Sequence, residues 1–243
     1  MFRVLLSAFF AAVVVLPALP APAAKDKKPD ERLGPITDEQ LHRSQNNLKE
    51  IGLAFHNYND TNGVMPTNQP TTDNKPGLSW RVQILPYIEQ DALYREFKLD
   101  EPWDSEANKK LIEKIPPIYV PVRGRAEKGM TFYQAFDGKH GWLKPGVTLP
   151  TGFPDGTSNT FMVAEAGKPV IWTKPDDMGF DGKTVPTLGG MFDGRFQVVF
   201  ADGHVQRFKK DTDKDVLKLL IDPADGIPVP DVEKWIDRDE EKK

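Results

Sequence analysis

The chain has 243 residues, of which 28% are charged, and it carries a formal net charge of −4 at pH 7 with no cysteine. The lack of cysteine excludes disulfides, thiolate metal sites and a lipid anchor on a thiol, and the acidic balance argues against a nucleic-acid partner. The length is sufficient for one hydrophobic core, and the 22 prolines and 19 glycines indicate many loops around it.

The N-terminal segment has the pattern of a secretory signal peptide. Arg3 precedes an apolar run at positions 4–16, and Ala21-Pro22-Ala23 has the small-x-small form of a cleavage site. The run is roughly thirteen residues long, which is short for a bilayer span. We therefore expect residues 1–23 to be a signal peptide and the mature protein to be extracytoplasmic, periplasmic or secreted, with an uncleaved anchor as the alternative. Residues 24–36 then form a charged linker.

The next segment predicts a long amphipathic helix that begins near Asp38. Thr37 can cap it, and Gln40 can complete a capping box. Asn62-Gly63 and Pro66 end the pattern. Apolar residues recur at helical spacing along one stripe, which requires a sheet or a second helix to cover it: Leu41, Leu48, Ile51, Phe55 and Tyr58.

Three further short helices are expected after a polar loop. Ser79 can cap residues 80–85, Pro86 can open residues 87–97, and Asp104-Ser105 can cap a helix that continues to residue 115.

From residue 118 onward the pattern favours short strands, and Asp202-Gly203 predicts a hairpin with a two-residue type I′ turn. A helix is expected at residues 211–220. The order of elements predicts an α+β domain over residues 37–230 and a charged tail at residues 231–243. The expected strands are residues 118–122, 130–136, 160–164, 170–173, 197–201 and 204–208.

Several blocks of sequence together resemble a pilin-like bacterial family, known as domain of unknown function 1559 or the prepilin-type processing-associated H-X9-DG domain. The resemblance implies a pseudopilin-like fold with a long N-terminal helix packed on an antiparallel β-sheet, and it implies no catalytic residues. The blocks are residues 44–66, SWRVQILPYIEQDALY at 79–94, PWDSEAN at 102–108, DGTSNTFMVAEAG at 155–167, WTKPDDM at 172–178 and FADGHVQRF at 200–208.

The chain departs from this family at three places. The secretory signal stands where members have a prepilin leader and a hydrophobic stalk, so filament assembly is not expected. The histidine of the H-X9-DG motif falls on Phe192. The two cysteines of the family correspond to Gln45 and the segment 119–122, which is consistent with the loss of one disulfide as a unit.

Candidate chemistry is sparse. Asp211, Asp213 and Asp215 have the spacing of a calcium loop, but Val216 stands where that loop needs glycine, so they are weak candidates beside a helix-capping role. Ser158 lies in turn sequence rather than in a nucleophile motif.

Tryptophans 80, 103, 142 and 172 could stack on a glycan, although aromatic residues at such spacing are more often core. We therefore expect a non-enzymatic exported protein without a cofactor, whose partner is a protein or a surface polymer. A glycan- or small-ligand-binding module is the alternative.

Overall fold

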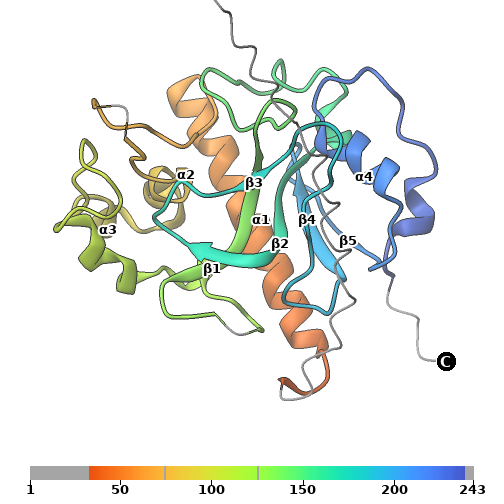
Figure 1. The fold of residues 1–243 in the computed structure, drawn as a ribbon, viewed down its shortest axis with the longest axis horizontal. Coiled ribbons are helices and arrows are strands. Elements are labelled where there is room, and N and C mark those ends of the chain that lie inside the picture. The colour runs from red at the N-terminus through yellow and green to blue at the C-terminus, as the bar shows by residue number, and fades with distance from the viewer. Residues whose placement is uncertain (1–32, 74, 125, 239–243) are drawn as a thin grey trace, which may run out of the picture.

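The computed structural model describes residues 33–73, 75–124 and 126–238, which form a mixed α+β fold (Figure 1). The predicted signal peptide at residues 1–23 lies outside the described residues. The predicted linker at residues 24–36 is described only from residue 33 onward. No helix within the described ranges is long and apolar enough to cross a membrane.

The long helix α1 (Asp38–Asn62) forms as the sequence predicts. The side chain of Thr37 accepts a hydrogen bond from the backbone N–H of Gln40, and the side chain of Gln40 accepts one from the backbone N–H of Thr37. These two bonds satisfy two backbone donors at the helix start. The helix ends at Gly63, whose φ of 71° is a left-handed conformation that glycine adopts without steric cost.

A five-stranded sheet lies against α1, with strand order β3-β1-β2-β4-β5. Neighbouring strands are antiparallel except for β1 and β3, which pair in parallel at Phe136–Met178 and Asp137–Gly179. The strands are β1 (Met130–Asp137), β2 (Phe161–Ile171), β3 (Met178–Gly179), β4 (Phe196–Phe200) and β5 (Val205–Phe208).

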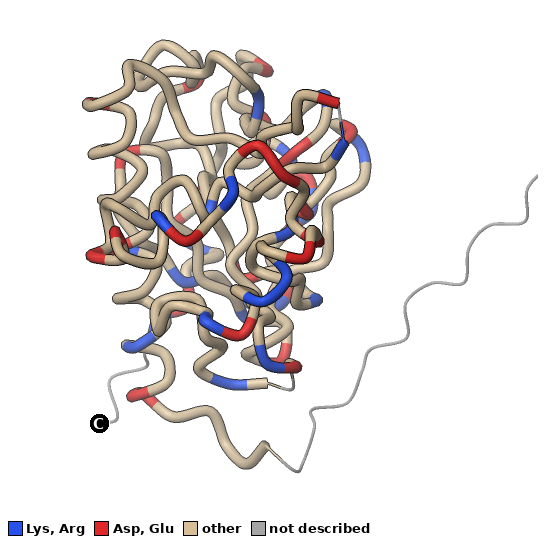
Figure 2. Tube along the Cα trace, turned by 90° about the vertical axis from the view of Figure 1, so that its left-hand side faces the viewer, with Lys and Arg blue, Asp and Glu red and all other residues tan. Residues whose placement is uncertain are grey.

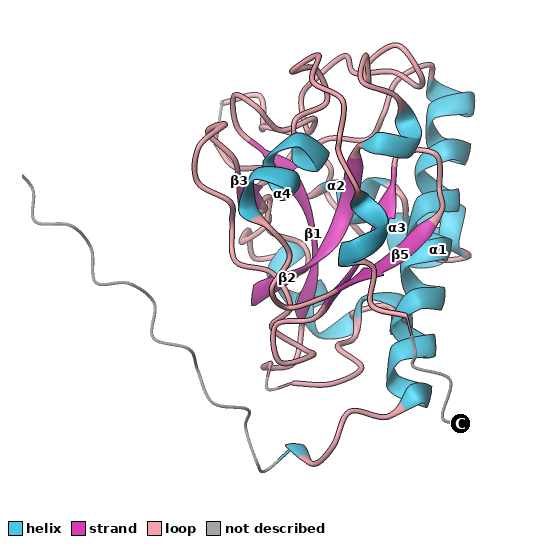
Figure 3. Ribbon diagram, turned by 90° about the vertical axis from the view of Figure 1, so that its right-hand side faces the viewer, coloured by secondary structure: helices cyan, strands magenta, loops and turns pink. Residues whose placement is uncertain are grey.

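The sheet is covered on both faces. Helix α1 lies along one face, and α4 (Lys214–Ile221) lies on the other (Figure 3). Every residue of β4 is buried, as expected for a strand with both faces covered. The helix approaches the sheet closely at Gly52, because a Cβ atom there would lie 2.8 Å from Cγ2 of Val199. Phenylalanine rings from β2, β4 and β5 pack together on one face of the sheet: Phe161, Phe196, Phe200 and Phe208.

The connections between α1 and the sheet contain short helices: α2 (Trp80–Gln83), η2 (Leu85–Ile88), α3 (Asp91–Tyr94), η3 (Asn108–Lys114) and η4 (Pro117–Tyr119). The predicted continuous helix at 87–97 is wrong, because Glu89 takes a left-handed φ of 59° and ends η2. The strand predicted at 118–122 is also wrong. Pro117 lacks an N–H for a ladder, and it starts the single turn η4 instead.

Two strand predictions need smaller corrections. The strands expected at 160–164 and 170–173 are one strand, β2, which continues through Gly167. The hairpin at Asp202-Gly203 is confirmed, but its turn is not type I′, because Asp202 is not among the residues with positive φ. Instead, the backbone N–H of Phe200 donates to the carbonyl of His204, and the backbone N–H of Gly203 donates to the carbonyl of Phe200. These bonds make a three-residue loop with Gly203 in the left-handed region.

The C-terminal segment lies along the free edge of β5. The backbone N–H of Asp237 donates to the carbonyl of Arg207, and that of Lys209 donates to Trp235, both over 2.9 Å. Phe208 and Ile236 form an antiparallel bridge between these contacts. Residues 231–238, which the sequence assigned to the tail, therefore pack on the sheet, and η6 (Val232–Trp235) belongs to this segment.

Candidate functional site

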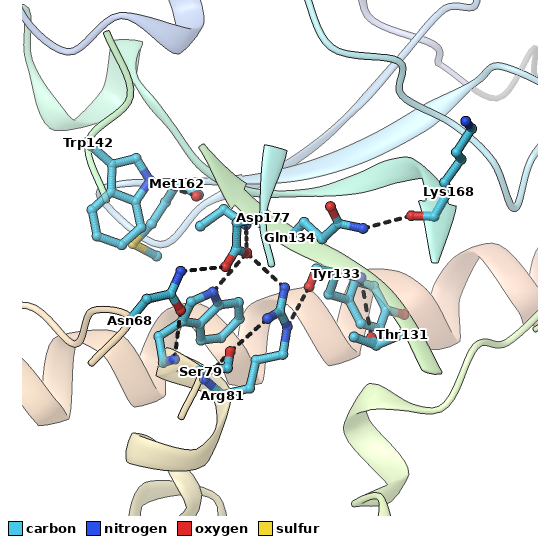
Figure 4. A network of polar contacts seen from close by, with 12 residues as sticks. Asn68, Ser79, Arg81, Thr131, Tyr133, Gln134, Trp142, Met162, Lys168 and Asp177 are labelled. Carbon is cyan, nitrogen blue, oxygen red and sulfur yellow. Dashed lines mark hydrogen bonds and ion pairs between the residues drawn. The ribbon is translucent and has the colours of Figure 1, made fainter. Parts of the chain in front are cut away.

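An ion pair between Arg81 and Asp177 lies in the middle of the fold (Figure 4). Nη2 of Arg81 and Oδ1 of Asp177 are 2.8 Å apart, and both side chains are fully buried. The same carboxylate accepts hydrogen bonds from Nε1 of Trp80 and Nδ2 of Asn68. Nη1 of Arg81 donates to Oγ of Ser79, which also caps α2. The neighbouring residues Trp80 and Arg81, together with Asn68, thus donate to one carboxylate.

The ion pair also completes the edge of β1 where no strand lies beside it. Nε of Arg81 donates to the carbonyl of Tyr133 over 2.9 Å. The backbone N–H of Ala135 donates to Oδ1 of Asp177 over 2.9 Å. From Phe136 onward, β3 is the neighbour of β1 on this side. The two charged side chains therefore satisfy backbone groups that an adjacent strand would otherwise satisfy.

Burial and hydrogen bonding act in opposite directions on this carboxylate. Burial raises the pKa of Asp177, while the guanidinium of Arg81 and the donors from Asn68, Trp80 and Ala135 favour the ionised form. The pair has no exposed atom with which it could reach a ligand. Its geometry supports a structural role, in which removing either partner would leave an unpaired charge in the core.

A second buried polar cluster joins α1 to the sheet. Oγ of Ser44 donates to Oε1 of Glu165, and it lies 2.7 Å from the hydroxyl of Tyr133. Nδ2 of Asn47 donates to that hydroxyl. On the other side, the backbone N–H of Gln197 donates to Oε2 of Glu165 over 2.8 Å. One acidic side chain from β2 thereby bonds to both α1 and β4.

Glu165 is completely buried, and it accepts hydrogen bonds from Ser44 and Gln197. Burial raises its pKa to about 8, because the ionised form loses the solvation of water. The hydrogen bonds from Ser44 and Gln197 and the charge of Arg207 act in the opposite direction but do not overcome burial. The carboxyl therefore holds its proton at neutral pH.

A groove of about 310 Å³ lies next to this cluster, between the first turns of α1, strand β5 and the C-terminal segment. Gln197 separates the groove from Glu165 and also donates to the carbonyl of Leu41. Polar side chains dominate its walls, and the described residues that line it are Leu41, His42, Gln45, Gln197, Val205, Gln206, Arg207, Asp237 and Arg238. Among these described residues, Asp237 is the one acidic side chain, and none is Phe, Tyr or Trp.

The tryptophans considered as glycan stackers are mostly core residues. Trp80, Trp142 and Trp172 are at most 1% exposed. Their indole N–H groups donate to protein acceptors: Asp177, the carbonyl of Met162 and the carbonyl of Ile112. Only Trp103 among the four is partly exposed, with Nζ of Lys174 5.8 Å from its ring centroid. The structure thus removes three of the four proposed stackers.

The three weak calcium candidates lie at the start of α4. Asp213 caps this helix by accepting from the backbone N–H of Asp215, while Asp215 pairs with Lys218 over 2.8 Å. Asp211 is exposed. Within the described ranges, no group of three His, Cys, Asp or Glu side chains is arranged to hold a metal ion.

Two of the histidines lie beside acidic side chains. Nδ1 of His140 is 2.6 Å from Asp222, and Nδ1 of His204 is 2.6 Å from Asp202 at the hairpin turn. Ser158 is exposed in the short 3-10 turn η5 (Thr157–Asn159), and none of the described histidines forms a hydrogen bond with it. Phe192, which stands in place of the family's histidine, is buried in the core.

Sequence reasoning missed the two buried networks. Glu165 stands in the apolar run 161–166, and Arg81 stands between Trp80 and Val82. A charged residue with apolar neighbours is the available signal for a buried polar contact. The sequence could not identify their partners, because Asp177 and Ser44 are 96 and 121 residues away from them.

Residues 42–122 match the profile of a family described as Protein of unknown function (DUF1559). The match supports the family that the sequence blocks resemble, over about a third of the chain. It contains most of α1 together with Arg81, whereas Asp177 and Glu165 lie beyond it. Neither the curated proteins nor the solved structures include a match to this chain.

Proposed function

We propose that this chain is an exported, non-enzymatic, pilin-like protein that acts in envelope structure, secretion or surface interaction. In this proposal it is an H-X9-DG variant that carries a secretory signal in place of the prepilin leader. Its function is to bind a partner, either a protein or a surface polymer, rather than to convert a substrate.

The burial of the charged and carboxyl side chains that form the two polar networks supports the proposal that the protein is not an enzyme. Catalysis requires reactive groups that a substrate can touch. Arg81, Asp177 and Glu165 are instead sealed in the core, where each bonds to backbone or side chains of neighbouring elements. Their positions fit a fold that uses the buried carboxyl of Glu165 to attach α1 to the sheet, and the buried ion pair to complete the edge of β1.

The pilin-like part is supported by the arrangement of α1 on a mainly antiparallel sheet and by the profile match over residues 42–122. The export part is supported by the apolar run after Arg3 and the Ala21-Pro22-Ala23 pattern.

Fractionation of a bacterial host that produces the full chain tests export. The chain is expected outside the cytoplasm with a mass that corresponds to a start after Ala23. A matched variant with Val14→Arg in the apolar run should stay in the cytoplasm at full length, because a charge there disrupts the signal. A wild-type chain that keeps Met1 and remains cytoplasmic would contradict the proposal. Crosslinking in the native envelope then identifies the partner.

A further inference from the structure

The tyrosines of the chain fall into two groups. Tyr119 and Tyr133 are buried, and their hydroxyls bond to the carbonyl of Arg81 and to Ser44. The other three are half-buried and lie together: Tyr58 in the last turns of α1, Tyr87 in η2 and Tyr94 in α3. We call these three residues the tyrosine cluster.

One contact between rings and the proximity of the third phenol define the cluster. The ring centroids of Tyr58 and Tyr87 are 5.6 Å apart with an edge-to-face angle of 65°. Burial raises the pKa of both Tyr58 and Tyr94, and the nearby phenol of Tyr87 raises both further. Nδ2 of Asn62 donates to the hydroxyl of Tyr87 over 2.9 Å. Rings from three separate elements therefore bring their hydroxyl groups into one neighbourhood.

The hydroxyl protons of the cluster have no acceptor in the described part of the chain. Tyr87 only accepts, from Asn62, and the hydroxyls of Tyr58 and Tyr94 form no hydrogen bond with a described residue. This differs from the buried pair, where each hydroxyl is bonded within the protein. Three donors beside partly exposed rings form a surface that can bind an acceptor-rich ligand.

A turn in the backbone between Tyr87 and Tyr94 places the two side chains near each other. Glu89 has a φ of 59°, and the N–H of Gln90 bonds to the carbonyl of Leu85. A left-handed conformation at a residue other than glycine is unfavourable and persists only where its surroundings fix it. The turn lets α3 return Tyr94 to the end of α1.

The charges on these elements restrict the ligand. Asp60, Glu89 and Asp91 are exposed on α1, at the end of η2 and on α3, and the last turn of α1 has no basic residue. Arg95 is paired with Asp91 over 2.6 Å. Over the side of the molecule that carries α3, acidic and basic residues are interspersed and form no basic field (Figure 2). The exposed acids Asp60 and Glu89, which lie next to the cluster, therefore disfavour an acidic polymer at the cluster itself.

We propose that the tyrosine cluster binds a polysaccharide that carries no acidic groups. The half-exposed rings pack against the C–H faces of sugar rings, and the three phenol hydroxyls donate to sugar oxygens. The inference rests on the proposed function, because it chooses the surface polymer from the two partner classes and assigns its site.

Binding of short oligosaccharides to the purified exported chain tests this proposal. Calorimetry would compare a neutral cello-oligosaccharide, a chitosan oligosaccharide and an acidic oligogalacturonate. The neutral or amino sugar should bind, and the acidic sugar should bind at least about tenfold more weakly because of like-charge repulsion. If neither the neutral nor the amino sugar binds, the proposal is wrong, while export, which fractionation measures separately, is unaffected.

Variants locate the site. A chain with Tyr58→Phe, Tyr87→Phe and Tyr94→Phe keeps the rings but loses three donors, and affinity should fall about fivefold for each donor that contacts the sugar. Tyr119→Phe makes the same atomic change in the core and should bind as the wild type does. Equal affinity of the triple variant and the wild type would overturn the assignment.

Nitration of tyrosine, mapped by mass spectrometry, measures sugar binding independently of the stability of the fold. Bound sugar should protect the tyrosine cluster from tetranitromethane. Unchanged nitration at saturating sugar would refute the site. Retained nitration together with quenched fluorescence of Trp103 would place the sugar at that indole instead.

Discussion

Replacing the buried acid Glu165 by glutamine should change how the stability of the fold depends on pH. The substitution keeps the shape of the side chain and removes its titration. In the wild-type chain, Ser44 on α1 and Gln197 on β4 both donate to this carboxyl, so its ionisation state acts on the contact between helix and sheet.

The size of the effect follows from the pKa. Burial raises the pKa of Glu165 from its ordinary value of 4.5 to about 8. Between these two values the folded chain holds a proton that the unfolded chain has released, so the free energy of unfolding falls as pH rises. One pKa unit corresponds to 1.36 kcal/mol, and the full interval amounts to roughly 5 kcal/mol. This contribution is fully present below pH 4.5 and is lost once pH exceeds about 8.

Urea unfolding at a series of pH values between 5 and 9 measures this dependence. The difference in unfolding free energy between the wild type and Glu165→Gln should shift toward the variant by several kcal/mol as pH rises. Glu113→Gln is the matched control, because Glu113 is an exposed acid whose removal should leave the curve parallel to that of the wild type. Parallel curves for the wild type and Glu165→Gln would refute the raised pKa.

Two further predictions concern the core. Asp177→Asn should destabilise the fold by about 3–5 kcal/mol in thermal or urea unfolding, because Arg81 loses its buried counter-charge. The matched control Asp91→Asn, at an exposed acid, should cost less than about 1 kcal/mol, and similar losses for the two variants would contradict a structural role. Gly52→Ala should cost about 1–3 kcal/mol through overpacking, despite about 1 kcal/mol of better helix propensity. In a Val199→Ala background the same substitution should stabilise, and an unchanged cost there would place the clash elsewhere.

The sequence by itself determined the local elements whose signals are contained in a few neighbouring residues. The start and end of α1 follow from a capping box and from Asn62-Gly63, because these caps satisfy backbone groups within one turn of helix. The hairpin at Asp202-Gly203 was located correctly for the same reason. The turn type was not predicted correctly, because Asp-Gly suits both a two-residue type I′ turn and a three-residue loop with glycine last. The pairing of β4 with β5 selects between the two.

Short helices and strands in the proline-rich middle were less predictable. The segment at 118–122 has the composition of a strand, yet it lies beside α1 as a single helical turn. Local composition cannot decide such a case, since tertiary packing overrides weak propensities. The order of helices and strands along the chain predicted the α+β class correctly, and the pseudopilin-like relationship that the family blocks imply stays a proposal.

Only the tertiary structure decided which polar residues are buried and with what they pair. Arg81 and Asp177 come from segments 96 residues apart, and they meet where β1 has no neighbouring strand. Periodicity and spacing report the faces of one element, whereas these contacts depend on the packing of several elements. The same reason explains why three tryptophans became core residues and three tyrosines were left at the surface: the folded chain, not the residue type, sets which aromatic rings solvent can reach.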